Sequence, residues 1–276
     1  MDLSTLESLK VAMKKSLFLL LILIQLHTTV FAQTKAVVYG SNIKAGHYAA
    51  VNGIKIYYET YGNGEPLLML HGNGGSIAAF KNQIPFFEKY YKVIAIDSRL
   101  QGKSGGSVDT LSYDMMASDF AGLLDYLHID SANVLGWSDG GINGLILAMK
   151  YPKKVKKLAE TGANIVPDTT ALYPDDLAGM RNTAFSMTST PIDKVLNRMM
   201  IYQPQIPYSE LKKIQCPVLV MAGDRDLIKP DHTLKIYQSL RKAELCIFPD
   251  SYHHVCQQHP ALFNETVLTF FKKNEN

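Results

Sequence analysis

The stretch that decides the fold is NVLGWSDGGINGL, residues 133–145. Ser138 follows a short apolar run, lies between Gly136 and Gly140, and leads into a helix-like segment. By chance alone, a Gly-x-Ser-x-Gly pattern should occur in roughly one chain of this length in a dozen. The pattern therefore carries weight only if it lies at a strand-to-helix turn and if the chain supplies partners for the serine.

Short apolar runs that end in Gly, Asp or Ser recur along the chain, as is typical of strands buried on both faces. Helix-like stretches separate them, such as 112–128, and residues 48–60 read as an opening hairpin around Asn52-Gly53. This order predicts the α/β class: a mostly parallel central sheet flanked by helices. The runs are PLLMLHG (66–72), KVIAIDS (92–98), NVLGWS (133–138), PVLVMAGD (217–224) and AELCIFPD (243–250).

Residues 163–210 interrupt this alternation between predicted strands at 156–161 and 217–222. The segment contains five prolines and short helical pieces such as 191–201, but no strand signature. Because it is too long for a simple connection, we expect a small helical cap inserted into the domain.

Ser138 needs a base to remove its proton, and the base needs a group that holds it in place. Two predicted strands end in suitable residues: GDRD supplies Asp224 and Asp226, and PDSYHH supplies His253 and His254. The carboxyl ends of parallel strands meet at one edge of the sheet. The sequence therefore predicts a Ser-Asp-His catalytic triad.

From about residue 48 to its C-terminus, the chain resembles the α/β-hydrolase family. The matching motifs are HGNGGS at 71–76, DSRLQGKSGG at 97–106, GWSDGG at 136–141 and the closing His. The resemblance selects Asp226 over Asp224 as the triad acid and His253 over His254 as the base. The family's usual glycine before the histidine is Tyr252 here, so His254 stays an alternative.

Ester hydrolysis also needs two donors for the oxyanion of the tetrahedral intermediate. The backbone N–H of Asp139 lies at the start of the helix that follows the nucleophile, where the helix dipole also helps. We expect the second donor to be the backbone N–H of Asn73, in the loop after His71-Gly72.

Within the family, GWSDGG and the AMKYPKKVKKLAETGAN that follows are most similar to the valacyclovir hydrolases, or biphenyl hydrolase-like proteins. The resemblance implies cleavage of α-amino acid esters, with the Asp139 side chain binding the substrate ammonium. The alternative is that Asp139 is a first-turn acid that stabilises the helix dipole. Trp137, Met199 and Met200 are further candidate substrate-binding residues, although the two methionines are equally consistent with packing.

The composition limits the other classes of function. The 276 residues are 47% hydrophobic and 19% charged, with a net charge of +3, and show no basic stripe that indicates nucleic acid. We find no phosphate-binding or dinucleotide fingerprint and no zinc pattern among the eight histidines, so we expect no metal or cofactor. The three cysteines are too few for a disulfide framework. Cys216 lies at the start of one predicted strand and Cys246 in the middle of the next, so a disulfide between them is not expected.

The N-terminus resembles a secretory signal in residues 1–32, with translation beginning at Met1 or Met13. Lys14-Lys15 precede an apolar run that His27 interrupts before it reaches the roughly 20 residues of a membrane span. We expect cleavage after Ala32, with residues 33–276 forming one hydrolase domain in the periplasm or outside the cell; the alternative is that the signal is retained as an uncleaved anchor.

These inferences predict an exported, cofactor-independent serine hydrolase that cleaves a small carboxylic ester or amide. Two alternatives remain open: an aminopeptidase resembling proline iminopeptidase, and a non-catalytic ligand receptor of the same fold. A receptor would stall after about one turnover, whereas an enzyme would cycle. The oligomeric state and the physiological substrate do not follow from the sequence.

Overall fold

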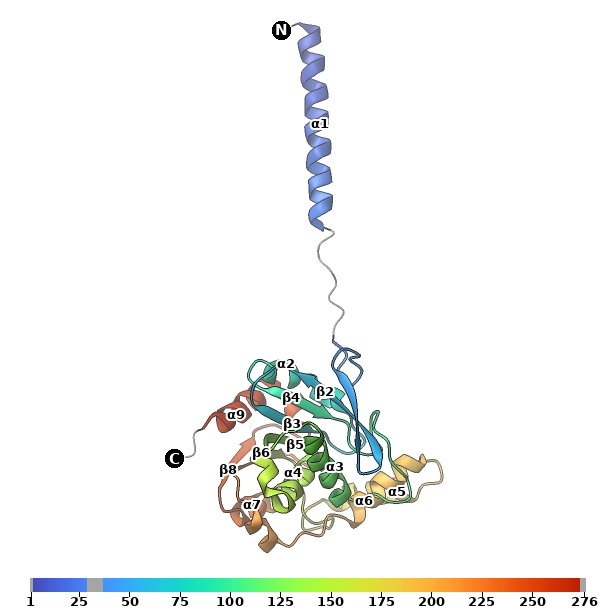
Figure 1. Ribbon diagram of the computed structural model, residues 1–276, viewed down its shortest axis with the longest axis vertical. Helices are drawn as coiled ribbons and strands as arrows, with labels where there is room; N and C mark the ends of the chain where they lie inside the picture. Colours follow the sequence, from blue (N-terminus) through green and yellow to red (C-terminus); the bar gives the residue numbers. More distant parts are fainter. Residues whose placement is uncertain (1, 29–36, 274–276) are drawn as a thin grey trace. The chain divides into compact units, whose positions relative to one another are not determined.

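The structure is a computed structural model that describes residues 2–28 and 37–273 and contains two compact units. In the N-terminal unit, helix α1 (Leu3–Thr28) contains the predicted apolar run (Figure 1). The predicted cleavage site after Ala32 lies outside the described residues. No helix in the described ranges combines the length and the apolar character that a membrane crossing requires.

The second unit, which begins at Val38, is built on an eight-stranded sheet with the strand order β1-β2-β4-β3-β5-β6-β7-β8. The first two strands form the predicted antiparallel hairpin and β2 also runs antiparallel to β4, whereas all other neighbours are parallel. The predicted mostly parallel sheet is therefore confirmed. The strands are β1 (Gly46–Val51), β2 (Ile54–Tyr61), β3 (Pro66–Leu70), β4 (Lys92–Ile96), β5 (Ala132–Trp137), β6 (Val155–Thr161), β7 (Val218–Gly223) and β8 (Ala243–Phe248).

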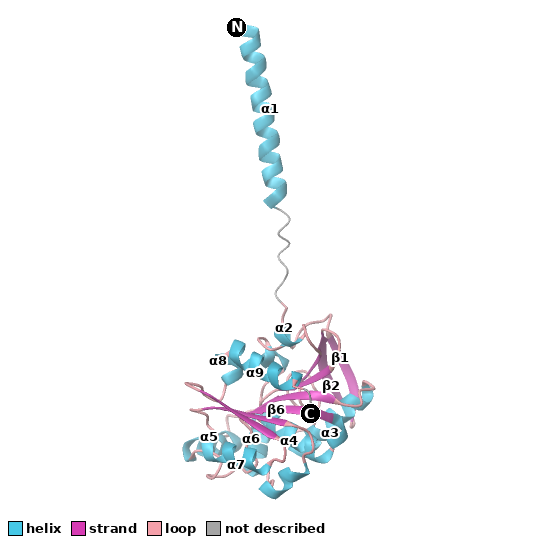
Figure 2. Cartoon of the chain, turned by 90° about the vertical axis from the view of Figure 1, so that its left-hand side faces the viewer, coloured by secondary structure: helices cyan, strands magenta, loops and turns pink. Residues whose placement is uncertain are grey.

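Helices cover both faces of this sheet (Figures 1 and 2). One face packs against α3, α4 and α7, and the other against α2, α8 and α9. Alternate residues of one strand serve the two sides, since Leu68 faces the first layer and Leu67 and Met69 the second. The helices are α2 (Ile84–Phe87), α3 (Tyr113–Tyr126), α4 (Asp139–Lys150), α7 (Pro230–Ser239), α8 (Val255–Gln258) and α9 (Pro260–Lys272), with short 3₁₀ turns at Ile77–Phe80, Pro152–Lys154 and Tyr208–Lys213.

The segment between β6 and β7 contains two helices, α5 (Pro174–Phe185) and α6 (Pro191–Tyr202), where the sequence predicts a cap. A capping box begins α6, because the Thr190 hydroxyl accepts from the backbone N–H of Asp193 while the Asp193 carboxylate accepts in return. An isolated bridge joins Leu172 to Ile228. The start of this segment is therefore tied to the loop that carries Asp226.

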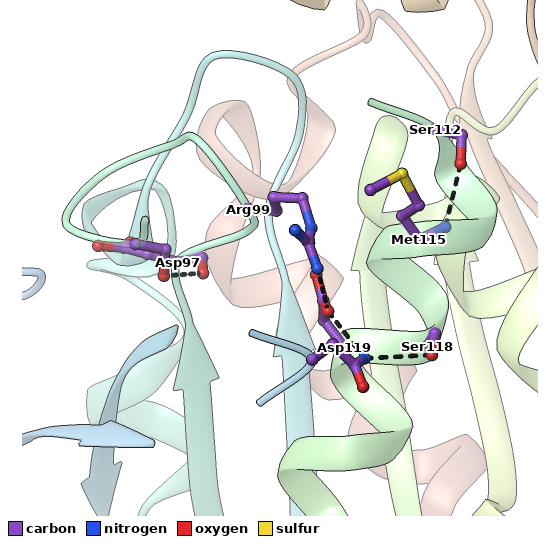
Figure 3. A network of polar contacts seen from close by, with 8 residues as sticks. Asp97, Arg99, Ser112, Met115, Ser118 and Asp119 are labelled. Atoms are coloured by element: carbon purple, nitrogen blue, oxygen red, sulfur yellow. Dashed lines mark hydrogen bonds and ion pairs between the residues drawn. The ribbon is translucent and has the colours of Figure 1, made fainter. Parts of the chain in front are cut away.

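The loop after β4 is held by a buried ion pair (Figure 3). Arg99 Nε donates to Asp119 on α3 at 2.8 Å, and the amide of Asn52 in the first hairpin donates to the same carboxylate at 3.0 Å. At the start of α3, the Ser112 hydroxyl accepts from the backbone N–H of Met115 at 3.1 Å. These contacts hold the loop after β4 and the first hairpin against α3.

Cys216 and Cys246 do not lie opposite each other on the neighbouring strands β7 and β8, as the sequence predicts. Cys246 is in the middle of β8 and pairs with Met221, whereas Cys216 precedes the first residue of β7. Cys256 is buried in α8, and burial raises the pKa of its thiol to about 12. A thiol in that environment stays protonated and is a poor nucleophile.

Candidate active site

Ser138 occupies a strained turn between β5 and α4. Its backbone has φ 57° and ψ −120°, a conformation that L-residues rarely adopt. A side chain at Gly136 would come within 2.3 Å of the Gly140 carbonyl oxygen, and one at Gly140 within 1.8 Å of the Leu70 carbonyl oxygen. Both glycines are therefore required by close backbone approach, and the turn presents the serine hydroxyl at the carboxyl end of the sheet.

The structure brings Ser138 together with the predicted base and acid. His253 Nε2 lies 2.8 Å from the Ser138 hydroxyl, and His253 Nδ1 lies 2.7 Å from Asp226 Oδ1. The Asp226 carboxylate is buried and also accepts from the backbone N–H of Ile228 at 3.0 Å. The three residues follow β5, β7 and β8, which all end at the same edge of the sheet.

The Asp226 carboxylate determines which group donates in the two hydrogen bonds of His253. An ionised carboxylate only accepts, so Nδ1–H of His253 donates to Asp226 and Nε2 keeps its lone pair. That lone pair accepts from the hydroxyl of Ser138, a residue that is partly exposed to solvent. The arrangement can remove the serine proton while Asp226 holds the ring.

The alternative acid and bases lie elsewhere. Asp224 accepts from the backbone N–H of Ser251 at 2.9 Å, and this bond lowers the pKa of its exposed carboxyl. The ring of His254 packs against the Trp137 indole rather than against the serine. His259 is exposed and precedes α9. Through its hydrogen bond with the Ser251 N–H, Asp224 holds the loop that carries His253.

The predicted substrate-binding residues Trp137, Met199 and Met200 differ in their burial and in their contacts. The indole Nε1 of Trp137 donates to the backbone carbonyl of His253 at 2.8 Å, so this side chain holds the histidine loop. Met199 is buried in the hydrophobic core on the α6 side, and Met200 is half-buried. Contact of these three residues with a substrate stays a prediction.

The two expected oxyanion donors lie on either side of the nucleophile turn. Asp139 is the first residue of α4, so its N–H has no acceptor within the helix. Asn73 lies in the loop after β3, where the buried His71 ring accepts from the Ser98 N–H at 3.0 Å and donates to the Gly72 carbonyl at 2.7 Å. Burial lowers the pKa of His71 to about 4, which keeps its ring neutral for both bonds.

The carboxylate of Asp139 is buried beside the nucleophile and each oxygen accepts a hydrogen bond. The Tyr113 hydroxyl donates to Oδ1 at 2.8 Å, and Asn73 Nδ2 donates to Oδ2 at 2.8 Å. Burial raises the pKa of Asp139 to about 6, against the lowering effect of the two donors. Burial and the Asp139 charge raise the pKa of Tyr113 well above 10, so the phenol remains a donor.

Sequence reasoning missed two buried residues around this site. Tyr113 lies 26 residues from Asp139 along the chain, and no motif links them. Glu160 is buried at the end of β6, accepts from the Ala163 N–H at 3.2 Å, and interacts with the charge of Asp226. The available signal for Glu160 was an acid near the end of a predicted strand. Among the side chains that the structure describes, in residues 2–16 and 37–273, no group of three or more His, Cys, Asp or Glu residues could hold a metal ion.

Comparison with known proteins places this chain in a family. The sequence model of the α/β hydrolase fold matches residues 65–198. A 2-hydroxy-6-oxononadienedioate/2-hydroxy-6-oxononatrienedioate hydrolase from Burkholderia vietnamiensis is 30% identical, covering 80% of this chain and 92% of its own. The serine hydrolase BPHL of Mus musculus is 28% identical, covering 81% and 85%, which confirms the resemblance to biphenyl hydrolase-like proteins. The chain belongs to the α/β-hydrolase fold family, which supports a hydrolytic activity.

Solved structures agree at the level of the fold. The enol-lactonase of Burkholderia xenovorans LB400 superimposes with a TM-score of 0.69 at 21% identity, covering 82% of this chain and all of its own (100%). An esterase from Thermogutta terrifontis gives a TM-score of 0.72 at 19% identity, covering 82% and 98%. The predicted α/β-hydrolase fold is confirmed.

Proposed function

We propose that this protein is a serine hydrolase that cleaves small carboxylic esters through an acyl-enzyme. The observation that carries the proposal is the chain of hydrogen bonds from Asp226 through His253 to Ser138, at distances of 2.7 and 2.8 Å. Because Ser138 occupies a strained turn and is a partly exposed residue, its placement supports a nucleophile rather than a packing residue.

The mechanism follows from these positions. Ser138 Oγ attacks the ester carbonyl while His253 Nε2 takes its proton, and Asp226 stabilises the resulting imidazolium. The backbone N–H groups of Asp139 and Asn73 receive the oxyanion. Collapse of the intermediate breaks the ester C–O bond, and His253 returns the proton to the leaving alcohol. Water then attacks the acyl-enzyme with His253 again as the base, which releases the acid and restores Ser138.

A panel of chromogenic esters with different acyl lengths tests this proposal. We expect multiple turnovers on at least one short-chain ester, and a loss of several orders of magnitude in Ser138→Ala with the fold retained. Hydrolysis of 2-hydroxy-6-oxononadienedioate with no ester turnover would instead favour the activity named for the Burkholderia vietnamiensis relative. A single turnover followed by a stall would favour a receptor.

The buried charge of Asp139 favours a narrower class, the α-amino acid esters. Its carboxylate lies one residue from the nucleophile, and a substrate ammonium would offset its repulsion of the oxyanion. We expect the wild type to prefer free α-amino esters over their N-acetyl forms, and Asp139→Asn to lose that preference while still cleaving neutral esters. Equal losses on charged and neutral esters would remove the ammonium site from the proposal.

Export belongs to the same proposal. The basic residues, the apolar run and Ala32 form the pattern of a cleaved secretory signal, which would deliver the domain outside the cytoplasm.

A further inference from the structure

The amide side chain of Asn73 connects the oxyanion loop to the helix that begins at the nucleophile. Asn73 Nδ2 donates to Asp139 Oδ2 at 2.8 Å, across 66 residues of sequence. Asp139 is 4% exposed and Asn73 is half-buried. A hydrogen bond to a buried carboxylate is charge-assisted and stronger than one between neutral groups.

This bond acts on the same residue that supplies an oxyanion donor. The loop is anchored before Asn73 by the His71 ring, and a turn joins the Gly75 N–H to the Gly72 carbonyl at 3.1 Å. Gly74, which follows Asn73, has φ 64° and offers no side chain to hold the loop. The Asn73 amide is thus the one side-chain contact, among those described, that fixes this residue against α4.

The carboxylate itself is held from the opposite side. The Tyr113 hydroxyl donates to Oδ1 at 2.8 Å, so the position of Asp139 is set independently of Asn73. Because Tyr113 holds the Asp139 carboxylate in place, the hydrogen bond from Asn73 Nδ2 can fix the position of the loop.

We propose that the Asp139 carboxylate is a positioning group that holds Asn73 through its Nδ2, so that the Asn73 backbone N–H points at the oxyanion. The inference rests on the proposed esterase function and deepens it. It assigns the Asp139 side chain a role with neutral esters, where no substrate ammonium is present. A correctly placed donor acts in the transition state, so disturbing it lowers kcat more than it raises KM.

Exchanging the two side chains provides the test, with kcat and KM measured on a neutral ester. Asn73→Asp places two carboxylates face to face, and we expect kcat to fall by roughly 10- to 100-fold. In Asp139→Asn, the amide cannot accept on both sides, and we expect a drop of about 10-fold. The double variant Asn73→Asp/Asp139→Asn restores an amide–carboxylate bond in reverse, and we expect kcat to recover to within a few-fold of the wild type. All variants keep both backbone donors.

Asn52→Asp is the matched control. Asn52 also donates from an amide to a buried carboxylate, but to that of Asp119, which is labelled in Figure 3, and not to one beside the nucleophile. We expect any loss of thermal stability in this variant to leave kcat unchanged. A parallel drop of kcat in Asn52→Asp would show that the effect is a general loss of stability.

The outcomes separate this inference from the proposed function. If the double variant has a kcat no higher than that of Asp139→Asn while Ser138→Ala is inactive, the positioning role is wrong and the esterase stands. If Ser138→Ala keeps its activity, the proposed function itself is wrong. If Asn73→Asp fails to fold, the kcat of the double variant compared with that of Asp139→Asn still tests the positioning role. A boronic acid that mimics the tetrahedral intermediate should bind each variant in proportion to its kcat.

Discussion

Asp226 and Asp224 are two carboxylates on one turn with different surroundings. Asp226 is buried against His253, whereas Asp224 is exposed and accepts from the Ser251 N–H. We therefore expect Asp226→Asn to reduce kcat by about 10⁴-fold, because the amide favours the wrong histidine tautomer.

Asp224→Asn is the matched control on the same turn, and we expect only a mild loss of ester turnover. Steady-state rates of the two variants measure the difference. A larger loss in Asp224→Asn than in Asp226→Asn would show that the acid has been assigned to the wrong residue.

Gly162 leaves room for the ring of His253. A Cβ at this position would lie 2.8 Å from His253 Cε1 and 2.9 Å from Nδ1, and its φ of +68° disfavours any side chain. We expect Gly162→Ala to displace the ring and lower kcat/KM by roughly 10- to 100-fold, measured on the best ester of the panel.

Gly179→Ala is the control for this substitution. Gly179 lies within α5, and a Cβ there would meet nothing within 4 Å. Alanine should stabilise the helix by about 0.5–1 kcal/mol and leave ester turnover unchanged. Unchanged turnover in Gly162→Ala would mean that the ring of His253 has space that the structure does not show.

At the scale of the elements, β6 holds the end of α9 through a buried lysine. Lys157 Nζ donates to the backbone carbonyls of Phe271 at 3.0 Å and of Phe270 at 3.4 Å, in the last turn of the helix. The last carbonyls of a helix lack part of their intrahelical bonding, although the Phe270 carbonyl also accepts from the Lys273 N–H at 3.3 Å, and a cation there favours the helix dipole. The strand and the helix are therefore linked by charge as well as by packing.

We expect Lys157→Met to lower the free energy of unfolding by about 1–3 kcal/mol, because the buried carbonyls lose their donor. Urea denaturation measures the change. Lys156→Met is the neighbouring control: Lys156 forms an exposed ion pair with Glu65, and its loss should cost less than about 1 kcal/mol. Equal effects of the two substitutions would contradict a capping role for Lys157.

The stability of the whole domain should depend on pH through Glu160. Burial, together with the charge of Asp226, raises the pKa of Glu160 from 4.5 to about 8. The folded chain thus keeps a proton that the unfolded chain releases, so stability present below about pH 4.5 is lost as the pH rises toward 8. The pKa of Asp139 is raised from 3.8 to about 6, so its ionisation also lowers the stability as the pH rises, but over a lower pH range.

We expect the free energy of unfolding to fall less steeply between pH 5 and pH 8 in Glu160→Gln than in the wild type. The glutamine stays neutral throughout this range, so it removes the cost of ionising a buried acid. Urea denaturation at several pH values measures the slope. Glu244→Gln, at an exposed ion pair with Lys273, should keep the wild-type slope. Identical slopes in wild type and Glu160→Gln would show that Glu160 is ionised in the folded protein.

Export also belongs to the whole molecule. If the proposed signal is cleaved, mass spectrometry of protein from the native host's envelope or medium should find an N-terminus at or near Gln33. Recovery of the full-length chain from the cytosol would contradict the proposal.

The sequence by itself determined the α/β fold, because five strands of the sheet are local apolar runs that end in a recognisable turn. It also predicted which strand ends carry Ser138, Asp226 and His253, since parallel strands bring their carboxyl ends to one edge. The tertiary structure brought Asn73 and Tyr113 to opposite sides of the Asp139 carboxylate. It also determined the burial of Glu160 next to the acid. Such contacts join residues far apart in the chain, and their geometry depends on how helices and loops pack against the sheet, which local sequence patterns do not encode.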